Sequence, residues 1–213
     1  RHALRLADLV RVDHFRGFAA YWEIPADAPN ATDGKWVPVP GEKLLHALQQ
    51  SFPYLPIIAE DLGVITPDVI ELRDKFKLPG MRVLHFAFAE GEANLFLPHH
   101  YIPNTVAYTG THDNDTSIGW WNTLSANEKA FAQQYLKSDG HEIQWDMMRA
   151  LSGSVANTVI FPMQDVLGLS SEHRMNFPGH PAGNWEWRFS WPQIRQEHTQ
   201  KLARMSAEHK RLH

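Results

Sequence analysis

Three carboxylates stand at the ends of short apolar segments of the chain: Asp13, Glu60 and Asp113. If these segments are parallel strands of a barrel, the strand ends meet around one axis and bring the acids together. Carboxylates held close together repel, which raises the pKa of one of them so that it stays protonated. Cleavage of a glycosidic bond needs such a split, with an ionised nucleophile and a protonated acid about 5–5.5 Å apart in retaining enzymes. Glycoside chemistry is therefore the hypothesis to weigh against the simpler reading of each acid as a surface or ion-paired group.

The surroundings of the first two acids differ. Arg11 lies two positions before Asp13, and residues two apart in an extended strand point to the same face. The pair is either a plain ion pair or a carboxylate that a cation holds ionised and oriented. Glu60 instead follows the apolar segment 56–59 and has no adjacent base. A nucleophile needs a low pKa and a general acid needs a raised one, so the two surroundings agree with those two tasks.

The elements that must position these acids alternate along the chain. Strands are predicted over residues 10–13, 56–60, 81–88, 105–109 and 158–163. Helices are predicted at residues 2–9, 42–52 and 141–151, after Thr66-Pro67, after a Ser125–Glu128 capping box, and from Pro192 onward. A long loop that contains Trp22 and Trp36 is expected between residues 18 and 41, and such a loop is usually functional.

This alternation predicts an α/β fold with a parallel sheet, its strands buried on both faces and covered by helices. Polar groups collect after the strands, as they do in a (β/α)₈ TIM-type barrel. An open doubly wound sheet is the alternative, but the chain has no G-x-G-x-x-G or G-x-x-x-x-G-K-[ST] motif. A barrel takes eight strands and ~250 residues, so this chain would supply about five strands, the later part, with inserted loops and helices.

Composition limits the other possibilities. The net charge of −4, without a Lys/Arg run longer than two, argues against nucleic-acid and membrane partners. The chain has no cysteine and no long apolar stretch. Asp113-x-Asp115 does not continue as a calcium loop, because Ile118 and Leu124 occupy the positions of its Gly and Glu. We therefore expect neither a metal nor a cofactor. Residues 1–213 are expected to form one domain. This domain is expected to be the C-terminal part of a longer catalytic domain, since the chain begins at Arg1 without Met.

Several longer motifs make the sequence recognisable. They read RVDHFRGFAAYWEIPA from residue 11, PIIAEDLGVITPDV from 56, LPGMRVLHFAF from 78, YTGTHDNDT from 108 and RMNFPGHPAGNWEWR from 174. Together they resemble the amylomaltases, or disproportionating enzymes, which are 4-α-glucanotransferases of glycoside hydrolase family 77 in the α-amylase clan. The motifs cover essentially the whole chain, in order and with the expected spacing.

The resemblance implies a role for each acid. Asp13 would be the nucleophile that forms a covalent glycosyl-enzyme, and Glu60 the general acid and then base. Asp113 would hold sugar hydroxyls and stabilise the transition state. Arg11 would keep Asp13 ionised, and His112 and His14 would contact the sugar in the same subsite.

Aromatic residues are further candidates for contacts with sugar, because their faces stack on the C–H faces of glucose rings. Trp36 and Phe86 are assigned to substrate binding, and the resemblance adds Asn176. Trp22, Trp185 and Trp187 are candidates for substrate loops or their support. Trp120 and Trp121, in an expected helix, are predicted to pack the fold.

The resemblance alone favours transfer of α-1,4-glucan segments to the 4-hydroxyl of an acceptor over hydrolysis. The expected partners are α-1,4-glucans, maltooligosaccharides and glucose, together with the missing N-terminal part of the same enzyme. The expected location is the cytoplasm, or the plastid in a plant. Two alternatives stay open: an α-1,4-glucan hydrolase of the same clan, or an inactive fragment with a glucan-binding or structural role.

Overall fold

The computed structural model describes residues 2–211. Within it the chain divides into two compact units, residues 1–81 and 82–213, and each is described by itself. The expectation of a single domain stays a prediction.

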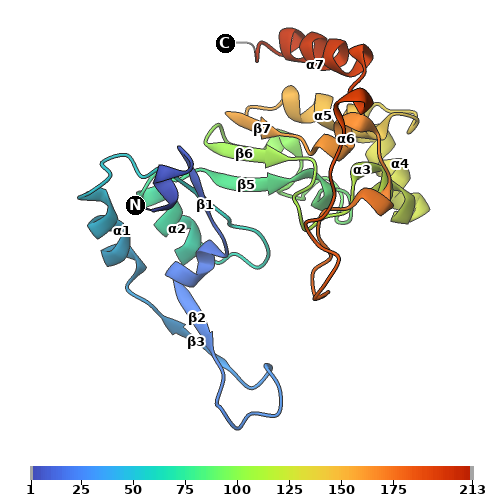
Figure 1. The fold of residues 1–213 in the computed structure, drawn as a ribbon. Coiled ribbons are helices and arrows are strands. Elements are labelled where there is room, and N and C mark those ends of the chain that lie inside the picture. The colour runs from blue at the N-terminus through green and yellow to red at the C-terminus, as the bar shows by residue number, and fades with distance from the viewer. Residues whose placement is uncertain (1, 212–213) are drawn as a thin grey trace. The chain divides into compact units, whose positions relative to one another are not determined.

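The first unit is built on two adjacent parallel strands. Strands β1 (Val10–Val12) and β4 (Ile57–Ala59) pair from Val10 opposite Ile57 to Val12 opposite Ala59. Helices α1 (Gly41–Gln49) and α2 (Pro67–Lys75) belong to the same unit (Figure 1). The buried core consists of Phe15, Leu45, Ala59, Val69, Phe76 and Leu78. Parallel pairing places the carboxyl ends of β1 and β4 side by side.

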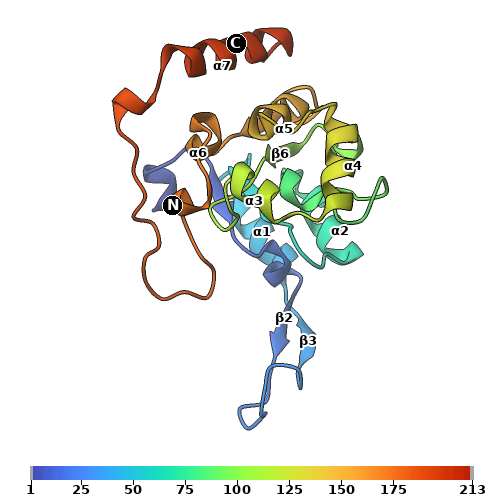
Figure 2. The same cartoon turned by 90° about the vertical axis from the view of Figure 1, so that its right-hand side faces the viewer.

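The segment expected to be a long loop contains a β-hairpin. Strands β2 (Ala20–Glu23) and β3 (Lys35–Pro38) pair antiparallel with Trp22 opposite Trp36, and Figures 1 and 2 show them as a two-stranded arm. The two indole rings lie 5.2 Å apart in an edge-to-face arrangement. Aromatic cross-strand pairs of this kind stabilise a hairpin. The loop prediction was wrong here because the proline-rich turn between the strands obscured two short alternating segments.

The second unit contains a three-stranded sheet and most of the helices. The sheet has the order β5 (Gly80–Val83, whose first residues belong to the first unit), β6 (Thr105–Tyr108) and β7 (Thr158–Ile160), and β6 pairs parallel with β7. The helices are α3 (Ser117–Thr123), α4 (Ala126–Leu136), α5 (Ile143–Ser152), α6 (Met163–Leu167) and α7 (Gln196–Glu208). Figure 2 shows the chain between α6 and α7 as an extended, irregular segment.

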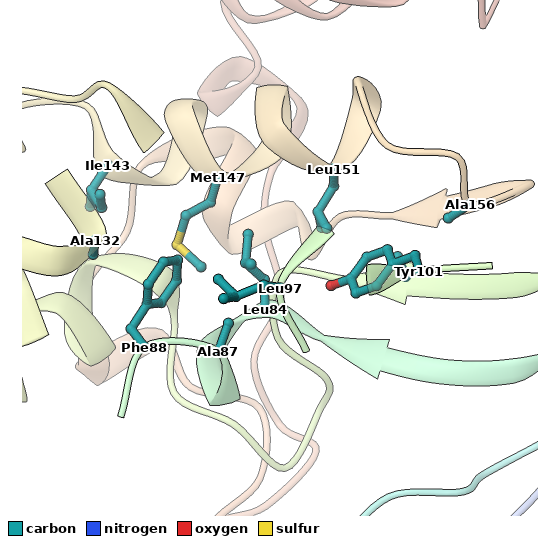
Figure 3. Packing of buried hydrophobic residues seen from close by; sticks show 11 residues of the cluster. Leu84, Ala87, Phe88, Leu97, Tyr101, Ala132, Ile143, Met147, Leu151 and Ala156 are labelled. Atoms are coloured by element: carbon teal, nitrogen blue, oxygen red, sulfur yellow. The ribbon is translucent and has the colours of Figure 1, made fainter. Parts of the chain in front are cut away.

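The core of this unit lies under α5. Ile143, Met147 and Leu151 follow one another at intervals of four and therefore share one face of the helix. Figure 3 shows this face directed toward Leu84 and Leu97, and all five side chains are buried. Trp120 and Trp121 pack against the same cluster, as predicted.

Three details of the sequence prediction were wrong. Residues 2–9 form only a short 3₁₀ turn (Ala3–Arg5), because Leu6 and Leu9 are exposed and bury no helix face. The third strand ends at Val83 and continues as a 3₁₀ turn (Leu84–Phe86). Strands β1 and β7 are only partly buried, whereas the prediction had them buried on both faces.

Candidate active site

Asp13 stands at the carboxyl end of β1 and forms an ion pair with Arg11. The Arg11 Nη2 atom donates to Asp13 Oδ1 over 2.8 Å. The Asp13 side chain is 78% exposed, so the contact itself adds little to stability. The predicted projection of both residues to one side is confirmed, and the carboxylate is both held and accessible. Its role as a nucleophile stays a prediction.

Glu60 stands at the carboxyl end of β4, one register step beyond the pairing of Val12 with Ala59. Its backbone N–H donates to the Val12 carbonyl at 3.0 Å, so its backbone continues the ladder. Its side chain is nearly buried and accepts two backbone hydrogen bonds, from His14 N at 2.6 Å and Leu62 N at 2.9 Å. These bonds fix the orientation of the carboxyl group beside the segment that follows Asp13.

His14 enters this arrangement through its backbone. Its φ of 47° is left-handed, a conformation in which histidine is more common than most residues. This conformation turns the chain directly after Asp13, and the turn brings the His14 N–H to Glu60. A contact of the His14 ring with sugar stays a prediction.

A buried ion pair lies next to Glu60 in the chain. Asp61 Oδ2 accepts from Arg73 Nη1 at 2.5 Å, and both side chains are almost fully buried. Asp61 Oδ1 also accepts from the Met81 N–H at 2.7 Å. Asp61 therefore joins the turn after β4 to α2 and β5. A Cβ atom at Gly80 would come within 2.6 Å of Asp61 Oδ2, so a larger residue there would have to displace this ion pair.

Trp36 lies on the hairpin, and its ring faces the side chain of Arg16. The Arg16 guanidinium carbon lies 3.9 Å from the Trp36 ring centre. The same guanidinium donates to the Val64 carbonyl at 2.7 Å and the Thr66 hydroxyl at 3.1 Å. Arg16 therefore links the hairpin to the start of α2 and covers one face of Trp36. Trp36 remains 45% exposed, so its ring is still accessible. Sugar binding at this ring stays a prediction.

In the second unit, Asp113 is held by groups from two segments. Asn176 Nδ2 donates to Asp113 Oδ1 at 2.6 Å, and His112 Nε2 lies 3.2 Å from Asp113 Oδ2. Arg174 Nη2 donates to the Asp113 carbonyl at 2.5 Å, and Arg174 Nε donates to the Asn176 carbonyl at 2.8 Å. The structure therefore brings together three predicted site residues, Asp113, His112 and Asn176. Their contacts with substrate stay predictions.

An exposed aromatic surface adjoins this group. The Trp185 ring lies 4.9 Å from the His112 ring at 36°, and Trp185 is 55% exposed. Its backbone has a φ of 63°, which is unusual for a bulky residue and marks a functional segment in many proteins. Phe86 is half-exposed and packs edge-to-face on Phe96 at 5.4 Å. Trp187 donates to His173 Nδ1 at 3.1 Å and is partly buried, which fits a supporting role.

Sequence reasoning missed two features of this unit. The first is Arg174, which lies at the start of the RMNFPG motif but has no spacing that relates it to Asp113. The second is a buried polar group formed by His85, Ser117 and Asp165. Asp165 could have been noticed as a charged residue after an apolar strand, since such a residue needs partners when buried.

Residues 2–211 contain neither a cluster of metal ligands nor a membrane-spanning helix. No group of three or more His, Asp or Glu side chains there is arranged to hold a metal ion. In the same part of the chain, no helix combines the length and apolar character needed to cross a membrane.

The sequence matches one known family and several of its members. A sequence profile of glycoside hydrolase family 77, described as 4-alpha-glucanotransferase, matches residues 1–196. The chain is 52% identical over 218 residues to the 4-alpha-glucanotransferase of Thermus thermophilus, covering 99% of this chain and 44% of that protein. It is 50% identical over 189 residues to the chloroplastic/amyloplastic 4-alpha-glucanotransferase of Arabidopsis thaliana, covering 88% of this chain and 33% of that protein.

Solved structures give a similar picture. An amylomaltase from Streptococcus agalactiae in complex with acarbose superposes with a TM-score of 0.93 at 36% identity, over 98% of this chain and 43% of that one. An amylomaltase from Corynebacterium glutamicum superposes with a TM-score of 0.75 at 17% identity, a likeness of fold alone. These matches confirm the predicted fold class, part of a (β/α)₈ TIM-type barrel. The chain spans less than half the length of each of these four proteins.

Proposed function

Because the chain belongs to glycoside hydrolase family 77, the 4-α-glucanotransferases, we propose that the protein carrying it transfers α-1,4-glucan segments to the 4-hydroxyl of an acceptor glucose or glucan. The structural observation that supports this most directly is the parallel pairing of β1 with β4. It sets an accessible acid, Asp13, and a nearly buried acid, Glu60, on neighbouring strand ends. A retaining double displacement needs two acids in such different surroundings.

The proposed reaction has two steps. In the first, a carboxylate oxygen of Asp13 bonds to C1 of the donor sugar while the bond from C1 to the glycosidic oxygen breaks. The leaving oxygen keeps the electron pair and takes the proton of Glu60. In the second, the acceptor 4-hydroxyl oxygen bonds to C1, its proton passes to Glu60, and Asp13 leaves with the electron pair of its ester bond.

The remaining residues would support these steps. Arg11 is proposed to keep Asp13 charged and aligned, as their 2.8 Å contact allows. Asp113 is proposed to bind sugar hydroxyls and stabilise the transition state, with Asn176 and His112 beside it. The proposed substrates are maltooligosaccharides and α-1,4-glucans, with glucose as acceptor or product. The proposed location is the cytoplasm, or the plastid in a plant.

Incubation of the full-length protein with maltotriose tests the proposal. Transfer is expected to give glucose together with oligomers longer than maltotriose. Glucose and maltose alone, without longer products, would reject transfer in favour of hydrolysis by the same residues. If neither maltotriose nor longer maltooligosaccharides are consumed, enzymatic activity on α-1,4-glucans is rejected altogether.

Variants assign the reaction to the two acids. Glu60→Gln is expected to lower kcat by about 10²–10⁴-fold, the usual contribution of a general acid. Asp13→Asn is expected to lower it at least as much. Asp33→Asn is the matched control, because Asp33 is an exposed acid in the turn of the hairpin. A loss of activity in the control as large as in the other two variants would contradict the assignment.

A further inference from the structure

A buried carboxylate lies beneath the segment that carries Asp113. Asp165, in α6, is 1% exposed and accepts three hydrogen bonds. Its Oδ2 atom accepts from the Thr109 hydroxyl at 2.6 Å and from the Ser117 hydroxyl at 2.7 Å. Its Oδ1 atom accepts from the Ser117 N–H at 2.7 Å. All three donors are themselves buried, so water does not compete for these bonds.

The two partners of Asp165 are the two ends of one loop. Thr109 is the last residue before the loop 110–116, and Ser117 is the first residue of α3 after it. Asp113 lies in the middle of this loop and is exposed. A single carboxylate thus fixes the distance between the loop's entry and its exit, while Asn176 and Arg174 contact Asp113 itself.

His85 is the third member of this buried group and lies in the 3₁₀ turn that follows β5. The hydroxyl hydrogen of Ser117 is used on Asp165, so the Ser117 oxygen accepts from His85 Nε2–H at 3.0 Å. His85 Nδ1 is then unprotonated, and it is buried without a hydrogen-bond partner. Burial, with a smaller contribution from the charge of Arg174, lowers the pKa of His85 to about 3. The ring is therefore neutral and stacks on Trp120 at 4.9 Å and 7°.

We propose that Asp165 is a positioning residue, which holds Asp113 in its working place by joining Thr109 and Ser117 at the two ends of the loop. The proposal rests on the proposed function, because it assumes that Asp113 acts on the sugar. It adds a residue that touches no substrate. The reason for an acid at this place is chemical: its Oδ2 accepts from two hydroxyls at once, and the other oxygen accepts from a backbone N–H.

Thr109 offers a mild test of this joint. Thr109→Val keeps the shape of the side chain and removes the hydroxyl that donates to Asp165, whereas Thr109→Ser keeps the hydroxyl. In the full-length protein, Thr109→Val is expected to lower kcat for maltotriose about tenfold with little change in KM, since displaced catalytic groups cost rate. Thr109→Ser is expected to restore most of that loss.

A matched control separates position from stability. Ser138→Ala removes a hydroxyl–carboxylate bond of 2.5 Å to Asp146, between α4 and α5 and outside the loop. We expect it to lower the melting temperature without changing kcat. If Ser138→Ala lowers kcat as much as Thr109→Val at an equal loss of stability, the positioning role is rejected.

Coupling to Asp113 is the sharpest measurement. If Thr109 acts through Asp113, then Thr109→Val should change the residual rate of Asp113→Asn by no more than about twofold, because the effects of coupled residues are not additive. A full tenfold additional loss in that background overturns the proposal.

Hydrogen exchange tests the joint independently of catalysis. Peptides that contain residues 110–116 are expected to exchange faster in Thr109→Val than in Thr109→Ser, whether or not the wild-type protein transfers glucan. If the wild-type protein is inactive but Thr109→Val still exchanges faster than Thr109→Ser, the loop joint is supported and only the proposed function is rejected. Unchanged exchange together with unchanged kcat in an active enzyme would reject the positioning role.

Discussion

The neutral, buried His85 predicts a loss of stability in mild acid. Its pKa is about 3 in the folded protein, against an ordinary value of 6.5. Between these values the unfolded chain binds a proton that the folded protein does not, so the free energy of unfolding falls as the pH falls from about 6.5 toward 3. At pH 5 the gap of about 1.5 units costs about 2 kcal/mol, and the full difference approaches about 5 kcal/mol near pH 3.

Other ionisable groups around His85 also titrate, so a variant must isolate its share. Asp165 lies beyond Ser117, and burial, with the nearby Asp115, raises its pKa. Its contribution has the opposite sign, because the folded protein binds that proton more readily than the unfolded chain. His85→Gln keeps an N–H group that can donate to Ser117 and leaves Asp165 in place. The comparison of the two proteins therefore reports His85 alone.

The assay is urea unfolding followed by tryptophan fluorescence between pH 5 and pH 7.5. The wild-type protein is expected to lose about 2 kcal/mol more than His85→Gln across this range. Equal losses in the two proteins would refute the argument that a neutral imidazole is buried at this position. A smaller loss in the wild-type protein would show that His85 is charged when folded.

Three substitutions test the packing of the elements, each by its urea-unfolding midpoint. Gly80→Ala places a methyl group against Asp61 and is expected to cost about 1–3 kcal/mol, and an unchanged midpoint would contradict the reported crowding. Ser125→Ala removes the capping box of α4 and should cost about 1 kcal/mol, whereas an equal cost for Asn127→Ala would argue against the cap. Leu151→Ala opens a cavity under α5 and should cost about 2–5 kcal/mol, and a cost below that of the cap substitution would contradict its place in the core.

The sequence predicted those features that depend on neighbours along the chain. The Ser125–Glu128 capping box is present with both of its hydrogen bonds, because a cap is decided within four residues. The contact of Arg11 with Asp13 follows from the two-residue repeat of a strand. The placement of Glu60 beside this pair follows from the alternation of strands and helices, which favours parallel neighbours.

Features that depend on irregular chain were not predicted. Arg174 reaches Asp113 across 61 positions from a segment without helix or strand periodicity, so no spacing relates the two residues. To predict the hydrogen bonds from Thr109 and Ser117 to Asp165, one must know how β6, α3 and α6 pack against one another. The composition of the chain does not give this packing. The hairpin was missed because the proline-rich turn between its two short strands reads as a loop.

The hydrogen bond from the His14 N–H to Glu60 makes one peptide group common to both proposed reacting acids. An N–H group binds a carboxylate more strongly than a protonated acid. In the proposed reaction Glu60 is deprotonated only while Asp13 carries the sugar, so the peptide after Asp13 is held most firmly during the life of the intermediate. This hydrogen bond would weaken again when Glu60 takes the proton of the acceptor hydroxyl. The proposed reaction would therefore tighten and loosen the backbone beside Asp13 once in each catalytic cycle.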